Sequence, residues 1–154
     1  MTTKRTSILY PTDFSELSKA ALPWVRRMAK ALDARVHCLY VVHDPKIYTY
    51  DAGWGTMVQL PPIEERVAGI HKQLQDFAAK ELAELTGVQT KVIVGVPFAE
   101  IVRYAEEIDA SMIMMTTHGH TGLSHVFFGS TTEAVLRKAN CPVMSIRSQD
   151  LDTE

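Results

Sequence analysis

The chain has few cysteines and no surplus of positive charge. Its 154 residues include two cysteines, Cys38 and Cys141, which lie too far apart for a CxxC pair or for the ligand spacing of a zinc site. Sixteen Lys and Arg residues against eighteen Asp and Glu residues give a formal net charge of −2, whereas a nucleic-acid-binding domain usually shows a basic surplus. We therefore expect a protein of the reducing cytoplasm with no nucleic-acid partner.

Long apolar runs and signal-like segments are also missing. No run approaches the ~18 apolar residues that a membrane-spanning helix needs. The opening stretch MTTKRTSILYPTD lacks the apolar core and the cleavage site of a secretory signal, so we expect no membrane partner. The composition, 46% hydrophobic and 22% charged, is that of a globular protein. Its length predicts one domain over residues 1–154, with a core at about 5–147 and a polar tail at 148–154.

Two common nucleotide-binding signatures do not occur. The sequence has no G-x-x-x-x-G-K-[ST], which argues against a Walker-type ATPase. It has no G-x-G-x-x-G after its first apolar run, which argues against a dinucleotide-dependent oxidoreductase.

Short apolar runs alternate with segments whose apolar residues repeat at helical spacing. This alternation predicts an α/β fold with a single doubly wound sheet of five parallel strands. We expect Pro23 to kink the first helix and Gly87 to end the second. Residues 43–62 have no clear period and predict a long surface loop. The expected strands are 7–10, 36–42, 91–96, 112–115 and 143–146, and the expected helices are 15–32, 63–85, 98–108 and 130–139.

The segment after the fourth expected strand is the strongest candidate for a binding site. Ligands of open α/β sheets bind beyond the carboxyl ends of the strands, and this segment contains Gly119 and Gly122 before Gly129-Ser130-Thr131 opens a helix. A helix N-terminus offers free N–H groups to an anion, and glycine lets a phosphate approach the backbone. The alternative is that the glycines only form a turn and Ser130 only caps the helix. The glycines alone slightly favour that alternative.

Histidines and aromatic residues leave further hypotheses open. His118, His120 and His125 lie in one segment, but a zinc site also needs second-shell partners, and no Cys or Asp is close by. We favour surface histidines, with His118 or His120 near phosphates. A stretch with Tyr48, Tyr50 and Trp54 could stack on a base, meet a partner, or only carry scattered aromatics. The two cysteines are most simply small buried side chains.

The chain resembles the universal stress protein family from Ile8 to Arg147. The matching pieces are ILYPTDFSELSKAAL, LYVV, VGVPFAEIVRYAEEIDASMIMMTTHGHTGL and FFGSTTEAVLRKANCPVMSIR. The resemblance implies a flavodoxin-like, or adenine nucleotide α-hydrolase-like, sheet with strand order 3-2-1-4-5. It also implies a homodimer formed through the last strand, Val143–Ile146.

The same resemblance implies an adenine-nucleotide ligand, ATP or AMP, with Mg²⁺ possible beside ATP. ATP-binding members carry G-x-x-G, nine residues, then G-[ST]; here Thr116 replaces the first glycine, and its Cβ is expected to weaken the phosphate contact. Asp13 would bind the ribose hydroxyls, Val41 would bind adenine through its backbone, and Pro11 and Thr12 would form the floor. The residues expected near the phosphates are Thr116, Thr117, His118, Gly119, His120, Gly122, Gly129, Ser130 and Thr131.

Three functions follow as expectations. The first is a nucleotide-binding regulatory homodimer of the stress response that is not primarily an enzyme. The second is a slow ATP hydrolase or phosphotransferase that uses His118 or His120. The third is an interaction module without nucleotide binding, and Thr116 is the reason to consider it. The residues alone also allow Asp13 to be a helix N-cap before Ser15.

Overall fold

The computed structural model describes residues 5–43, 61–117 and 129–147 of the chain. The strands are β1 (Ser7–Pro11), β2 (Arg35–Val42), β3 (Gln89–Val94), β4 (Met112–Thr116) and β5 (Val143–Ile146). The helices are α1 (Glu16–Lys19), α2 (Leu22–Ala31), α3 (Ile63–Glu81), α4 (Pro97–Glu107) and α5 (Ser130–Lys138). Within this part of the chain, no helix has the length and apolar character to span a membrane.

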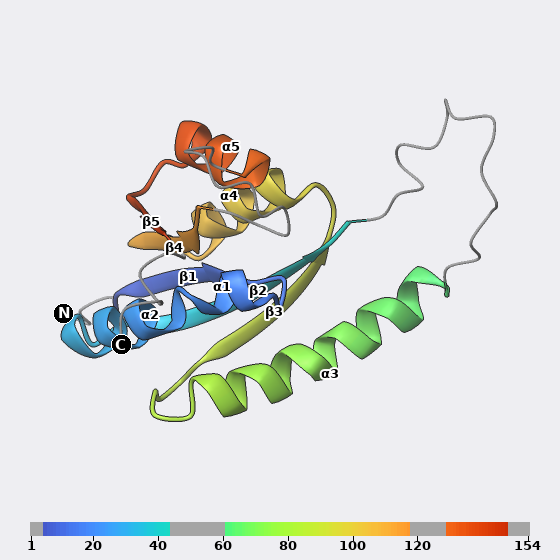
Figure 1. Ribbon diagram of the computed structural model, residues 1–154, viewed down its shortest axis with the longest axis horizontal. Helices are drawn as coiled ribbons and strands as arrows, with labels where there is room; N and C mark the ends of the chain where they lie inside the picture. Colours follow the sequence, from blue (N-terminus) through green and yellow to red (C-terminus); the bar gives the residue numbers. More distant parts are fainter. Residues whose placement is uncertain (1–4, 44–60, 118–128, 148–154) are drawn as a thin grey trace.

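The five strands form one parallel sheet in the order β3-β2-β1-β4-β5, which confirms the expected fold. Strand β1 is central, with Ile8 in register with Val36 of β2 on one side and Met112 of β4 on the other. Helices α1, α2 and α3 lie on one face of the sheet, and α4 and α5 lie on the other (Figure 1). The chain therefore changes direction in the sheet between β1 and β4, the place where such folds bind ligands.

The sheet is buried on both faces. Ile8 and Tyr10 of β1 pack into the core beneath α2 and α3, while Leu9 packs into the core beneath α4 and α5. Successive strand residues point to opposite faces, so a strand covered on both sides is apolar throughout. Cys38 belongs to the first of these cores, which confirms the prediction of a small buried side chain.

The single kinked helix expected over residues 15–32 is wrong, because the structure has two helices there. Ser15 caps α1, and its Oγ accepts a hydrogen bond from Ser18 N at 3.1 Å. Pro23 lies in the first turn of α2, where the missing N–H leaves no helical hydrogen bond unmade. The proline therefore starts a helix instead of kinking one.

Gly87 does not end α3 directly. The helix ends at Glu81 with Leu82 as its C-cap, and Gly87 follows in the turn before β3 with φ of +73°. Glycine adopts this left-handed conformation without the steric cost that a Cβ brings.

Two glycine-to-alanine substitutions should change stability in opposite directions. Gly69→Ala should raise the free energy of unfolding by about 0.5–1 kcal/mol, because Gly69 is exposed within α3 and a Cβ there would contact nothing. Gly87→Ala should lower the free energy of unfolding by about 1 kcal/mol, because a left-handed backbone is unfavourable for a residue with a Cβ. The cost is not a clash, since the nearest atom to such a Cβ would be 3.8 Å away. Urea unfolding of both variants checks the two signs. Equal shifts would contradict the backbone argument.

Candidate functional site

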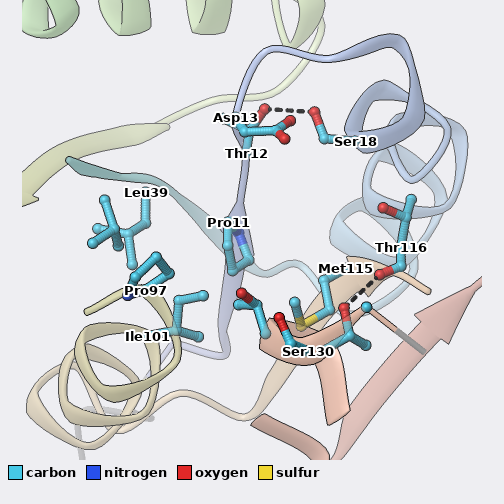
Figure 2. A pocket seen from close by; sticks show the side chains of 14 residues that line it. Pro11, Thr12, Asp13, Ser18, Leu39, Pro97, Ile101, Met115, Thr116 and Ser130 are labelled. Atoms are coloured by element: carbon cyan, nitrogen blue, oxygen red, sulfur yellow. Dashed lines mark hydrogen bonds between the residues drawn. The ribbon is translucent and has the colours of Figure 1, made fainter. Parts of the chain in front are cut away.

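A cavity of about 330 Å³ lies at the carboxyl ends of β1 and β4, next to the start of α5 (Figure 2). Figure 2 shows Leu39, Pro97 and Ile101 on one side of Pro11, with Met115 and Thr116 on the other. Among the described lining residues, Asp13 is the only one with a charged side chain. The lining is formed by Pro11, Thr12, Asp13, Ser18, Leu39, Val41, Pro97, Ile101, Met115, Thr116, Gly129, Ser130, Thr131 and Thr132.

The turn after β1 places Asp13 at this cavity. Thr12 N donates to Leu39 O at 2.9 Å, which extends the β1–β2 pairing past the end of β1. Phe14 then takes a left-handed conformation with φ of 65°, which is uncommon for a residue with a Cβ. Its ring stacks on Tyr40 with centroids 4.8 Å apart, and its N–H donates to Thr12 Oγ1 at 3.1 Å. Packing and hydrogen bonding together hold this strained turn.

The Asp13 carboxylate is not the N-cap of α1, because Ser15 takes that role. Asp13 Oδ1 instead accepts hydrogen bonds from Ser15 N at 3.0 Å and from Ser15 Oγ at 2.5 Å. Asp13 is exposed at the edge of the cavity, and Ser15, which bonds its carboxylate, is the N-cap of α1. The carboxylate is therefore accessible to a ligand in a fixed orientation.

The N-terminus of α5 forms another wall of the cavity. Gly129 is its N-cap, and no side chain of the described residues caps the helix. Gly129 N donates to Thr117 O at 2.6 Å, and Thr132 Oγ1 donates to Thr116 O at 2.9 Å, so the first turn is attached to the end of β4. The amides of the first turn and the positive end of the helix dipole favour an anion here, with two more hydroxyls from Ser130 and Thr131.

Thr116 and Thr117 differ in their placement. Thr116 ends β4 and lines the cavity, and its side chain is buried. Thr117 is also buried, but it is not among the lining residues, and its N–H donates to Ile146 O of β5 at 2.9 Å. Thr117 follows the end of β4, and its backbone continues the pairing of β4 with β5.

Eight of the thirteen expected site residues line the one cavity: Pro11, Thr12, Asp13, Val41, Thr116, Gly129, Ser130 and Thr131. Four others, His118, Gly119, His120 and Gly122, lie outside the described residues. Six further lining residues were not among those expected: Ser18, Leu39, Pro97, Ile101, Met115 and Thr132. Pro97 follows the third expected strand, so the rule that ligands bind beyond strand ends points to it, although it was not among the thirteen expected residues. Ser18, Ile101 and Thr132 lie within helices, so finding them required knowing which helix face turns inward.

The remaining hypotheses have different outcomes. The described residues contain no cluster of three or more potential metal ligands, while His125, Tyr48, Tyr50 and Trp54 lie outside them. Burial raises the pKa of the Cys38 thiol to about 12 and also raises the pKa of Cys141, which is partly buried. Because the thiolate is the reactive form, neither thiol is activated as a redox sensor would require.

Comparison with known proteins identifies relatives along nearly the whole chain. The model of the universal stress protein family matches residues 4–147. Universal stress protein MJ0531 of Methanocaldococcus jannaschii is 35% identical over 144 residues, which cover 91% of this chain and 81% of that protein. The structure of universal stress protein UspA from Lactobacillus plantarum matches with a TM-score of 0.72 at 27% identity, covering 94% of this chain and 100% of that chain.

A second archaeal relative agrees in both sequence and fold. Universal stress protein MJ0577 of Methanocaldococcus jannaschii is 30% identical over 161 residues, covering 93% of this chain and 95% of that protein. Its structure has a TM-score of 0.67, covering 94% of this chain and 97% of that chain. Family model, sequence and fold agree: the chain belongs to the universal stress protein family.

Proposed function

We propose that the chain binds an adenine nucleotide, ATP or AMP, in the cavity at the ends of β1 and β4. It then acts as a regulatory homodimer of the cytoplasmic stress response and not primarily as an enzyme. The observation that carries the proposal is the cavity itself, which combines an apolar side, the Asp13 carboxylate and the N-terminus of α5. These three features suit a base, a ribose and a phosphate respectively.

Each part of the nucleotide has a matching part of the lining. Leu39, Pro97 and Ile101 offer apolar surface to adenine, and the backbone of Val41 is available for its hydrogen bonds. Asp13 accepts the ribose hydroxyls, since an ionised carboxylate has only acceptors. The first turn of α5 binds the phosphate through its amides and hydroxyls.

The fold itself is known to accommodate such a ligand. A universal stress protein solved in complex with cAMP has a TM-score of 0.65 to this chain at 19% identity, covering 95% of this chain and 99% of that chain. This likeness concerns the fold alone, so the residues of the present cavity carry the proposal. In this chain, Thr116 adds a Cβ and a hydroxyl beside the proposed phosphate site.

Strand β4, which lines the cavity, pairs directly with β5, the strand proposed to form the dimer contact. Thr116 of β4 is in register with Ile146 of β5, and β5 is an edge strand of the sheet. A ligand that binds better to one arrangement of the end of β4 and the first turn of α5 increases the population of that arrangement. A protein partner that recognises the same arrangement can then respond to the ligand. We propose Val143–Ile146 as the dimer contact; a monomeric mass in light scattering would exclude it.

Calorimetric titration of the nucleotide-stripped protein with ATP plus Mg²⁺, and separately with AMP, tests the proposal. We expect micromolar affinity and one site per chain for at least one of the two nucleotides. Absence of both heat and a thermal shift would show that Thr116 has disabled the site. The chain would then have to be an interaction module that binds no nucleotide.

A further inference from the structure

Six residues in and around the turn after β1 form a connected hydrogen-bond network. Thr12 Oγ1 and Ser18 Oγ are 3.0 Å apart, and Ser18 Oγ donates to Ser15 O at 2.9 Å. Ser18 N donates to Ser15 Oγ at 3.1 Å, and Ser15 Oγ donates to Asp13 Oδ1 at 2.5 Å. Figure 2 shows Asp13 and Thr12 together, with Thr12 bonded to Ser18. The network therefore ends at the carboxylate that faces the cavity.

The direction of each hydrogen bond in this network is determined. A hydroxyl group has one proton, and Ser18 gives its proton to Ser15 O, so Thr12 must be the donor to Ser18 Oγ. Thr12 Oγ1 in turn accepts from Phe14 N at 3.1 Å. The hydrogen bonds thus run in one direction from Phe14 N through Thr12 and Ser18 to Ser15 O, an arrangement in which successive hydrogen bonds strengthen one another.

A tyrosine of the hydrophobic core also bonds the network. Tyr10 is fully buried, and its OH donates to Ser18 O at 2.9 Å. Burial raises the pKa of Tyr10 far above its ordinary value, so the phenol keeps the proton that it donates. Thr12 and Ser18 are also buried, which shields their hydrogen bonds from competing water.

We infer that Thr12 and Ser18 are positioning residues that make the site distinguish ribonucleotides from 2′-deoxyribonucleotides. This inference rests on the proposed function, in which Asp13 accepts the two ribose hydroxyls. Both hydroxyls can be reached together only if the carboxylate keeps one orientation. Thr12 sets that orientation in two ways. Its Oγ1 accepts a hydrogen bond from the amide of Phe14, the strained residue next to Asp13. Its hydrogen bond to Ser18 also holds Ser15 in place, and the N and Oγ of Ser15 both bond Asp13 Oδ1.

The test compares AMP with 2′-deoxy-AMP, because the two ligands differ only in the 2′-hydroxyl, one of the two that Asp13 is proposed to bind. Calorimetry on the wild-type chain should show AMP bound about tenfold more tightly, the effect of one hydrogen bond to a charged group. Thr12→Val has nearly the same shape without the hydroxyl, and it should reduce this ratio to about twofold or less. Thr12→Ser retains the hydroxyl and should preserve the ratio. Melting temperatures of all three proteins show that each is folded.

Each other outcome has a definite meaning. If Thr12→Val weakens AMP and 2′-deoxy-AMP by the same factor, Thr12 only shapes the cavity and the inference is overturned. The inference is also overturned if wild-type protein binds both ligands equally, although the proposed function then stands. If neither ligand nor ATP binds to folded wild-type protein, the proposed function fails and the inference fails with it. Should Thr12→Val not fold, Ser18→Ala removes the next hydroxyl of the network and should lower the same ratio.

Discussion

Asp13→Asn should weaken AMP binding by roughly 10- to 100-fold, because hydrogen bonds to a charged group contribute about 1.5–3 kcal/mol and each 1.4 kcal/mol is tenfold in affinity. Asparagine keeps an Oδ1 that can accept from Ser15 N, as Asp13 Oδ1 does at 3.0 Å, so the turn should survive. It loses the negative charge that the ribose hydroxyls are proposed to bind. Calorimetric titration of wild-type and variant protein with AMP measures the difference.

Ser15→Ala is the matched control for this substitution. It retains the Asp13 carboxylate but removes the hydroxyl that caps α1 and donates to Asp13 Oδ1. The lost cap should cost about 1 kcal/mol of stability, whereas AMP affinity should fall much less than in Asp13→Asn. An Asp13→Asn protein that binds AMP like the wild type would remove Asp13 from the proposed ribose site.

Leu74→Ala should lower the free energy of unfolding by about 2–5 kcal/mol, as large-to-small core substitutions do. Helix α3 has nineteen residues, of which only Leu74 and Ala78 are buried, and Leu74 is fully buried in the core beneath it. A cavity at this position therefore removes the main attachment of a long helix to the sheet. Since whole domains are stable by only about 5–15 kcal/mol, urea unfolding should show a large shift in midpoint.

Leu136→Ala provides the same chemical change at an exposed position. Leu136 lies in α5 with 37% of its surface exposed. A surface substitution in a helix, with alanine as the better helix former, should stay within about 0.5 kcal/mol of wild type. Comparable losses in both variants would mean that α3 is held to the sheet by contacts other than Leu74.

The architecture could be predicted because each strand carries its own signal. A strand covered on both faces must be apolar at consecutive positions, and β1 and β2 satisfy this condition. The break between α1 and α2 could not be predicted in the same way. Pro23 is compatible with a kink inside a helix and with the first turn of a new one, and the choice depends on the Ser15 cap and on the turn at Ala20 and Ala21.

The candidate site could be predicted where it follows strand ends and where Gly129-Ser130-Thr131 opens a helix. Asp13 and Thr116 were located because β1 and β4 end beside them. Ser18 and Ile101 were missed because they lie on helices, where a rotation of the helix decides which side chain faces the cavity. The left-handed Phe14 gave no sequence signal either, because its conformation is held by stacking on Tyr40, a residue of another strand.

The central position of β1 has a consequence for the newly made chain. One edge of β1 pairs with β2, and the other edge pairs with β4, which comes much later in the sequence. The hydrogen bond from Ser7 N to Ser111 Oγ, for example, joins residues 104 positions apart. On the ribosome, β1, β2 and β3 are complete before residue 112 has been translated. Until then the nascent chain exposes an apolar strand edge, which is the feature that promotes pairing between chains. Products truncated before β4 should therefore aggregate, whereas the finished chain covers that edge with its own C-terminal third.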